Sequence, residues 1–200
     1  MKYILTFFCL TFFYNLAFCQ SEQVETSSLH IRVGGGLTFP SGGWNSEVDM
    51  GYSAGAEFSF GRNDDLLSLV LIISYHSLPL NIPEHLSRDL IATNWDLVYM
   101  MASLKIGTKI STGAKLYAFP MLGLLIEQSP DITMGSLKLN GVNSTWFAFG
   151  FGLGFSVPDL DKDSRQKLDF GFRFILSGPN YQATNAPTGI MQLQIAFIFL

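Results

Sequence analysis

Three aspartates stand close enough together to suggest a metal site. Asp159, Asp161 and Asp163 follow the D-x-D-x-D spacing that can wrap around a calcium ion. A calcium loop of the EF-hand type also needs glycine at its sixth position and glutamate at its twelfth. This chain has Ser164 and Phe170 there, so the pattern favours a solvated turn. No other spacing, including that of His30, His76 and His85, predicts a metal or another cofactor.

A second group could support acyl transfer. His76 has Ser74 and Ser77 beside it and Glu84 further along the chain. A Ser-His-Glu hydrolase needs a nucleophile hydrogen-bonded to its base and a third group that orients the base. The spacing does not fix that geometry, so the prediction is a protein without enzymatic activity, with a lipid-acting hydrolase as the alternative.

The remaining ionisable residues share one property. Each lies in a segment in which large apolar residues alternate with small or polar ones, and each occupies one of the small or polar positions. These residues are Arg32, Glu57, Lys105, Glu127, Asp169 and Arg173. Alternation is the period of a β-strand, whose side chains point alternately to opposite faces. We expect these charges to be enclosed and to neutralise one another in a hydrogen-bonded lumen network, with a transport role as the alternative.

The stretch Ser144 to Pro158, STWFAFGFGLGFSVP, shows what kind of element holds them. Its odd positions from Phe147 are large and apolar, whereas its even positions from Ala148 to Ser156 are alanine, glycine or serine. A soluble strand usually carries charge opposite its apolar face. The pattern here is instead typical of a strand with lipid on one side and a narrow lumen on the other.

Eight segments alternate in this way: 29–39, 51–61, 66–77, 95–108, 115–127, 144–158, 167–177 and 190–200. Their connections alternate long and short, as in outer-membrane barrels with short periplasmic turns and long external loops. The prediction is an all-β, eight-stranded antiparallel up-and-down transmembrane barrel. Its predicted lipid-facing residues include Phe58, Phe60, Leu69, Leu71, Leu104, Leu124, Phe149, Phe151, Phe170, Phe172, Ile195 and Phe197.

The connections carry weaker signals. Asn81, Pro83 and Glu84, followed by Leu86 and Leu90, predict a short capped helix, and residues 128–143 read as a polar loop. Pro120 lacks a backbone donor and predicts a local irregularity in its strand. Tryptophans in or beside the long loops, at positions 44, 95 and 146, suggest either loop packing or a binding surface, with packing favoured.

Composition and the N-terminus set the compartment. Of 200 residues, 14% are charged, against roughly 25% in soluble domains. The net charge of −4 argues against nucleic acid as a partner. Residues 1–19 resemble a cleaved export signal, with lipidation of Cys19 as an alternative; 20–28 form a short periplasmic lead-in and 29–200 the barrel. The chain has only two cysteines, Cys9 and Cys19.

The segments RVGGGL (32–37), GYSAG (51–55) and AFIFL (196–200) give the chain its resemblance to a known family. It resembles the OmpA/OmpX-like, "porin-family" small outer-membrane barrels of Gram-negative bacteria. That resemblance implies a cell-envelope protein with a closed lumen, four surface loops and a structural or adhesion-type role. It also implies outer-membrane lipid and the barrel-assembly machinery, reading the strand with Phe197 and Phe199, as partners, and leaves room for an unknown extracellular ligand. The alternatives are a lipid A deacylase-like enzyme and a soluble lipocalin-like carrier.

Overall fold

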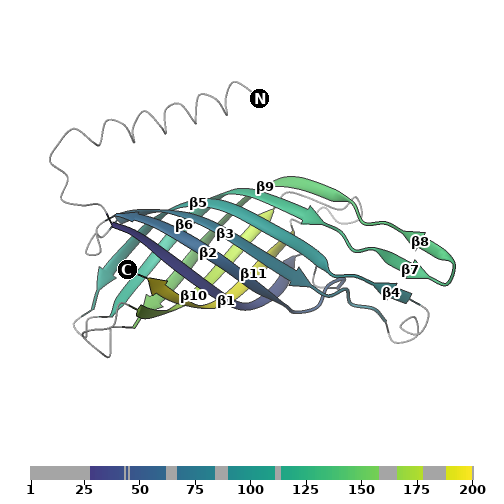
Figure 1. Ribbon diagram of the computed structural model, residues 1–200, viewed down its shortest axis with the longest axis horizontal. Coiled ribbons are helices and arrows are strands. Elements are labelled where there is room, and N and C mark those ends of the chain that lie inside the picture. The colour runs from purple at the N-terminus through teal and green to yellow at the C-terminus, as the bar shows by residue number, and fades with distance from the viewer. Residues whose placement is uncertain are drawn as a thin grey trace, which may run out of the picture.

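A computed structural model describes residues 28–42, 44, 46–61, 67–83, 90–110, 114–157, 166–177 and 188–199. Eight long strands form a closed antiparallel barrel (Figure 1): β1 (Ser28–Gly42), β2 (Gly51–Gly61), β3 (Leu67–Leu78), β5 (Trp95–Lys109), β6 (Lys115–Gln128), β9 (Asn143–Ser156), β10 (Gln166–Ser177) and β11 (Thr188–Phe199). Each strand pairs with its neighbours along the chain, and β1 closes the sheet against β11. The eight-stranded up-and-down barrel predicted from the alternation is confirmed. The described residues include no helix with the length and apolar character needed to span a membrane.

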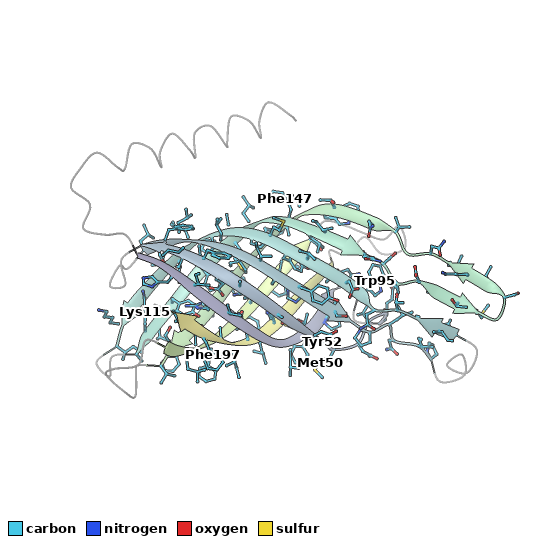
Figure 2. All side chains as sticks on the ribbon, viewed as in Figure 1. Met50, Tyr52, Trp95, Lys115, Phe147 and Phe197 are labelled. Atoms are coloured by element: carbon cyan, nitrogen blue, oxygen red, sulfur yellow. The ribbon has the colours of Figure 1, made fainter. Side chains whose placement is uncertain are left out.

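Side-chain burial follows the predicted alternation. Along β6 every second residue from Tyr117 to Glu127 faces the lumen, and all of these except Gly123 are buried, while the residues between them are exposed. All twelve positions predicted to face lipid have outward parity; Phe58, Leu69 and Phe172 are half-buried and the other nine are exposed. Figure 2 shows Phe147 and Phe197 projecting away from the barrel wall. Apolar outside and charged inside is the reverse of a lipocalin-like carrier, so that alternative does not fit.

Two residues of β3 take a place that the sequence pattern left unclear. Val70 and Ile72 are 0% and 2% exposed and lie inside the barrel, between inward-facing serines. They belong to an apolar layer that fills much of the lumen together with Leu97, Tyr99, Met101, Leu125, Ile175 and Ile190. An eight-stranded barrel has an interior that side chains can just fill.

Three short strands lie beyond the barrel and were not predicted. They are β4 (Leu90–Ala92), β7 (Ile132–Met134) and β8 (Leu137–Leu139), which form a separate sheet in the order β4-β7-β8. In Figure 1 this sheet extends past one end of the barrel. The prediction that residues 128–143 form a polar loop is therefore wrong. The predicted helix is wrong at Leu90, which begins a strand, and its residues 84–89 lie outside the described part of the chain.

Pro120 interrupts one ladder of β6, as predicted. The pairing with β5 stops between Met121 and Ala118 and resumes in the same register. Proline has no N–H to donate to the ladder. The Pro120 carbonyl accepts a hydrogen bond of 2.7 Å from the Ser103 hydroxyl of β5. The strand therefore stays in place without a bulge.

The belt of outward apolar residues gives a first prediction. Leu122 is 51% exposed and lies near the middle of the apolar row on β6, which runs from Leu116 to Ile126. Leu122→Arg should destabilise the barrel by about 2–4 kcal/mol, and Ile126→Arg at the edge by about 0–1 kcal/mol. Urea unfolding in lipid vesicles measures both. Equal costs at the two positions would contradict a hydrocarbon belt centred near Leu122.

Candidate functional site

The lumen holds an ionic cluster built around Glu57 on β2. Its carboxylate accepts a hydrogen bond from Arg32 at 2.9 Å and another from Arg173, and the Lys105 ammonium lies 3.5 Å from it. These three cations come from β1, β10 and β5, so the cluster ties strands from across the barrel. Glu57 is 2% exposed. A buried carboxylate is tolerable only with such partners, since isolated burial of a charge is very costly.

Asp169 on β10 is the second carboxylate of the cluster. The Arg32 guanidinium lies 3.2 Å from it, and it accepts hydrogen bonds from the hydroxyl of Ser156, at 2.6 Å, and from that of Tyr117. The structure thus brings together five of the six charges that the sequence indicated. Three cations and two carboxylates leave this cluster with one excess positive charge.

Two aromatic rings of β6, which the sequence analysis did not identify as part of the network, complete the cluster. The Lys105 ammonium lies 4.2 Å from the centre of the Tyr117 ring and 5.5 Å from the centre of the Phe119 ring. The Arg32 guanidinium lies 5.1 Å from the Tyr117 ring centre. The Arg173 guanidinium lies 5.9 Å from the Phe119 ring centre. Cations are attracted to the faces of such rings, more strongly where water is excluded. Only the inward parity of Tyr117 and Phe119 could have indicated their place.

These rings explain the run of small residues on β9. A Cβ at Gly152 would lie 2.2 Å from the Phe119 ring, and one at Gly154 would lie 2.1 Å from the Tyr117 ring. The glycines therefore let the rings lie directly on the backbone of the neighbouring strand. Two of the small even positions of β9 are therefore explained by aromatic side chains from β6, whereas a Cβ at Gly150 would instead meet the backbone of β10.

Glu127, the sixth predicted charge, lies elsewhere in the lumen. It is 2% exposed and sits near the opposite end of β6 from Tyr117, in the layer of Leu97 and Tyr99. The predicted network is therefore divided: five residues form the cluster and Glu127 belongs to the mostly apolar layer.

The described residues between β1 and β2 pack against the start of β5 and the residues that follow β3. Trp44 is 1% exposed and its ring packs against Trp95 at a centroid distance of 5.7 Å. Val48 forms a β-bridge with Leu80, and the Asn81 N–H donates to the Glu47 carbonyl at 2.8 Å. Figure 2 places Trp95 at the end of the barrel from which the short sheet extends. Of the two readings of these tryptophans, packing is the one that their burial supports.

The histidine group forms hydrogen bonds but does not have the geometry of an open catalytic site. His76 Nε2 lies 3.0 Å from Ser74 Oγ, and Nδ1 lies 2.9 Å from Thr38 Oγ1. The third partner is thus a neutral hydroxyl, not a carboxylate. His76, Ser74 and Thr38 are at most 1% exposed, so a substrate has no access to the serine, whereas a nucleophile must reach its substrate. Ser77 accepts a hydrogen bond from Asn94 instead.

Several predicted residues lie outside the described part of the chain. They are Glu84, His85, the three aspartates at 159, 161 and 163, the signal segment 1–19 and the lead-in up to residue 27. Among the residues that are described, no group of three or more histidine, cysteine, aspartate or glutamate side chains could hold a metal ion.

A closed eight-stranded antiparallel barrel with an apolar outside and ionic side chains buried inside is typical of the class of small outer-membrane barrels. The fold comparison agrees. Neisserial surface protein A superposes with a TM-score of 0.58 at 17% identity, covering 88% of this chain and 99% of that one. Ail, the attachment invasion locus protein of Yersinia pestis, gives 0.50 at 14% identity, covering 86% and 99%.

Both of these proteins are small eight-stranded outer-membrane barrels. The resemblance to OmpA/OmpX-like barrels is thereby confirmed for the fold. No protein-family model matches the sequence, and no curated protein matches it significantly.

Proposed function

We propose that this chain is an integral outer-membrane barrel with a structural or adhesion-type role, exported by a cleaved signal at residues 1–19. The observation that carries the proposal is the division of side chains. Away from the strand ends, the exposed outward faces of all eight strands are apolar, whereas Glu57, Asp169 and Arg173 are each 2% exposed inside. Such a surface is stable in hydrocarbon and unstable in water. Its structural relatives include an attachment invasion locus protein, which supports the adhesion-type role.

Fractionation and gel migration test this proposal. An integral barrel stays with the membrane through carbonate washing and migrates faster on an unboiled gel than after boiling. Release by carbonate together with unchanged migration would contradict membrane insertion. Binding of labelled cells to host-matrix components, with and without the protein, then tests the adhesion-type role and any extracellular ligand.

We also propose that the lumen is closed and that the protein does not conduct solutes. Supporting observations are the ionic cluster and the buried apolar side chains inside the barrel, and the packing of the Trp44 ring against Trp95. We therefore expect single-channel recordings to show no large, stable conductance. An open pore of porin size in planar bilayers would contradict a closed lumen and favour transport.

A lipid A-modifying enzyme is the second candidate, favoured by the Ser74–His76 hydrogen bond of 3.0 Å. The burial of both residues argues against it. Mass spectrometry of lipid A from cells with and without the protein distinguishes the two. An unchanged profile supports the non-enzymatic role, and a lost acyl chain that requires Ser74 would overturn it.

Recognition of the last strand is part of the same proposal. Outward-facing Phe197 is 52% exposed and the backbone of Phe199 pairs with Ile31 of β1, so β11 closes the barrel. We propose that the barrel-assembly machinery reads this strand and that lipid then covers it.

A further inference from the structure

The short sheet beyond the barrel is a continuation of the barrel wall. Asp96 faces Gln128 between β5 and β6, and Ala92 faces Ile132 between β4 and β7 in the same register. The pairing of Gln128 with Asn143 likewise continues as that of Ile132 with Leu139. Because the register does not change, the sheet keeps the parity of the barrel: residues that continue the outer rows of β5, β6 and β9 form one of its faces.

That outer-parity face, called the arm face below, is entirely apolar. It consists of Leu90, Ala92, Ile132, Met134, Leu137 and Leu139. Met134, Leu137 and Leu139 are 46%, 53% and 55% exposed, so the described residues leave them largely uncovered. The opposite face carries Ile91, Thr133 and Lys138. A sheet with one apolar and one partly polar face is stable when the apolar face packs against another layer.

The arm face is held in a defined shape before any partner binds. β7 and β8 are joined by a two-residue turn with Gly135 at φ 57°, the conformation that such a tight hairpin turn requires at its first position. The Thr93 N–H donates to the Asp131 carbonyl at 3.0 Å, and the Ser129 N–H donates to Val142 at 3.1 Å. A preformed surface loses little conformational entropy on binding.

Lipid does not reach this face. The apolar row of β6 from Leu116 to Ile126 spans about 34 Å along the strand, or about 26 Å of membrane thickness at a tilt of about 40°. That already accounts for the roughly 25 Å apolar band of an outer-membrane barrel. Ile132 and Met134 lie about 15–20 Å higher at the same rise and tilt, beyond a headgroup region of about 5–8 Å on each side.

We propose that the arm face is the contact between two copies of this chain standing side by side in the membrane. Outer parity directs the face sideways, toward a neighbouring barrel, and a second copy presents the same face at the same height. The only twofold axis open to two barrels inserted in the same direction is normal to the membrane. That axis brings the two arm faces together front to front, as in a sheet sandwich.

The chemistry of the face suits self-association. In a twofold contact each residue lies near the same residue of the other copy, so a charged side chain there would face a like charge. The six residues of the arm face carry none, and Lys138 lies on the other side. Packed sheets are about 10 Å apart, a spacing that also lets the outward apolar rows of β6 and β9 meet below. The arm face alone is smaller than the roughly 800 Å² per partner of a stable interface, and these rows extend it.

Cysteine cross-linking tests the contact, because the only cysteines of the chain are Cys9 and Cys19, both in the predicted export signal. Leu137→Cys places a thiol on the arm face and Lys138→Cys places one on the other face at the same height. With a short bismaleimide on whole outer membranes, we expect at least tenfold more cross-linked dimer for L137C than for K138C. Equal yields, or no dimer from an L137C that a monofunctional maleimide labels, would overturn the proposal.

The inference rests on the membrane insertion proposed above, so the same samples are checked for carbonate resistance and heat-modifiable migration. An inserted protein without L137C cross-links refutes the dimer alone, whereas a released protein refutes insertion. Leu137→Asp should lower the dimer fraction in nanodiscs at least fivefold and Lys138→Asp should not. A bimane probe at position 137 that brominated lipid quenches in single-copy nanodiscs would assign the face to lipid and overturn the dimer.

Discussion

Glu57→Gln should destabilise the barrel by about 3–5 kcal/mol, the usual cost of removing one partner of a buried ionic group. Arg32, Lys105 and Arg173 all contact this carboxylate. The neutral amide would leave three cations facing the single carboxylate of Asp169. The folded fraction on unboiled gels and urea unfolding in lipid vesicles measure the loss. A change below about 1 kcal/mol, the level of an exposed pair, would show that the cluster does not hold the barrel together.

Removing one cation as well should restore part of that stability. Lys105 is the suitable choice, because its ammonium is 3.5 Å from Glu57 and lies over the Tyr117 ring, and methionine is an uncharged side chain that can occupy the same space. The double variant Glu57→Gln/Lys105→Met should be more stable than the two single effects added together, by about 0.5–3 kcal/mol. Strict additivity would mean that Glu57 acts through its packing and not through its charge.

The barrel could be predicted from sequence because parity is a strong constraint. A slip of one residue in β1, β5 or β10 would turn Arg32, Lys105 or Arg173 toward lipid, at about 2–4 kcal/mol for each. The eight strand bounds of the structure accordingly differ from the predicted segments by at most three residues where the structure describes both ends. The ionic cluster could be predicted as a set of inward residues, but not its partners, since pairing depends on register between strands.

The arm could not be predicted in the same way. Its strands have three residues each, too few to show alternation, and Pro130 and Gly141 between them are typical of loops. Residues 90–92, 132–134 and 137–139 nevertheless form strands, because the pairing of β5, β6 and β9 continues past the barrel in the same register. The apparent helix spacing of Leu86 and Leu90 illustrates the same limit: four-residue spacing is also compatible with one face of a strand.

The lumen side of β9 gives the second large effect. Gly152→Ala should cost about 1–3 kcal/mol, the range for overpacking a filled interior. Its Cβ would lie 2.2 Å from the Phe119 ring, which is itself 3% exposed and lies under Lys105 and Arg173. The ring has to move, and the cations that it supports move with it. Urea unfolding in lipid vesicles reports the loss of stability.

Gly171→Ala on β10 is the matched control. Gly171 also faces the lumen, yet the nearest atom to an added Cβ is 3.9 Å away. Alanine there should be neutral or should stabilise by about 0.4–1 kcal/mol, because it restricts the unfolded chain. If both alanines destabilise equally, β-strand propensity or lumen crowding in general is responsible. If Phe119→Leu restores the stability lost in Gly152→Ala, the Phe119 ring is what requires glycine at this position of the neighbouring strand.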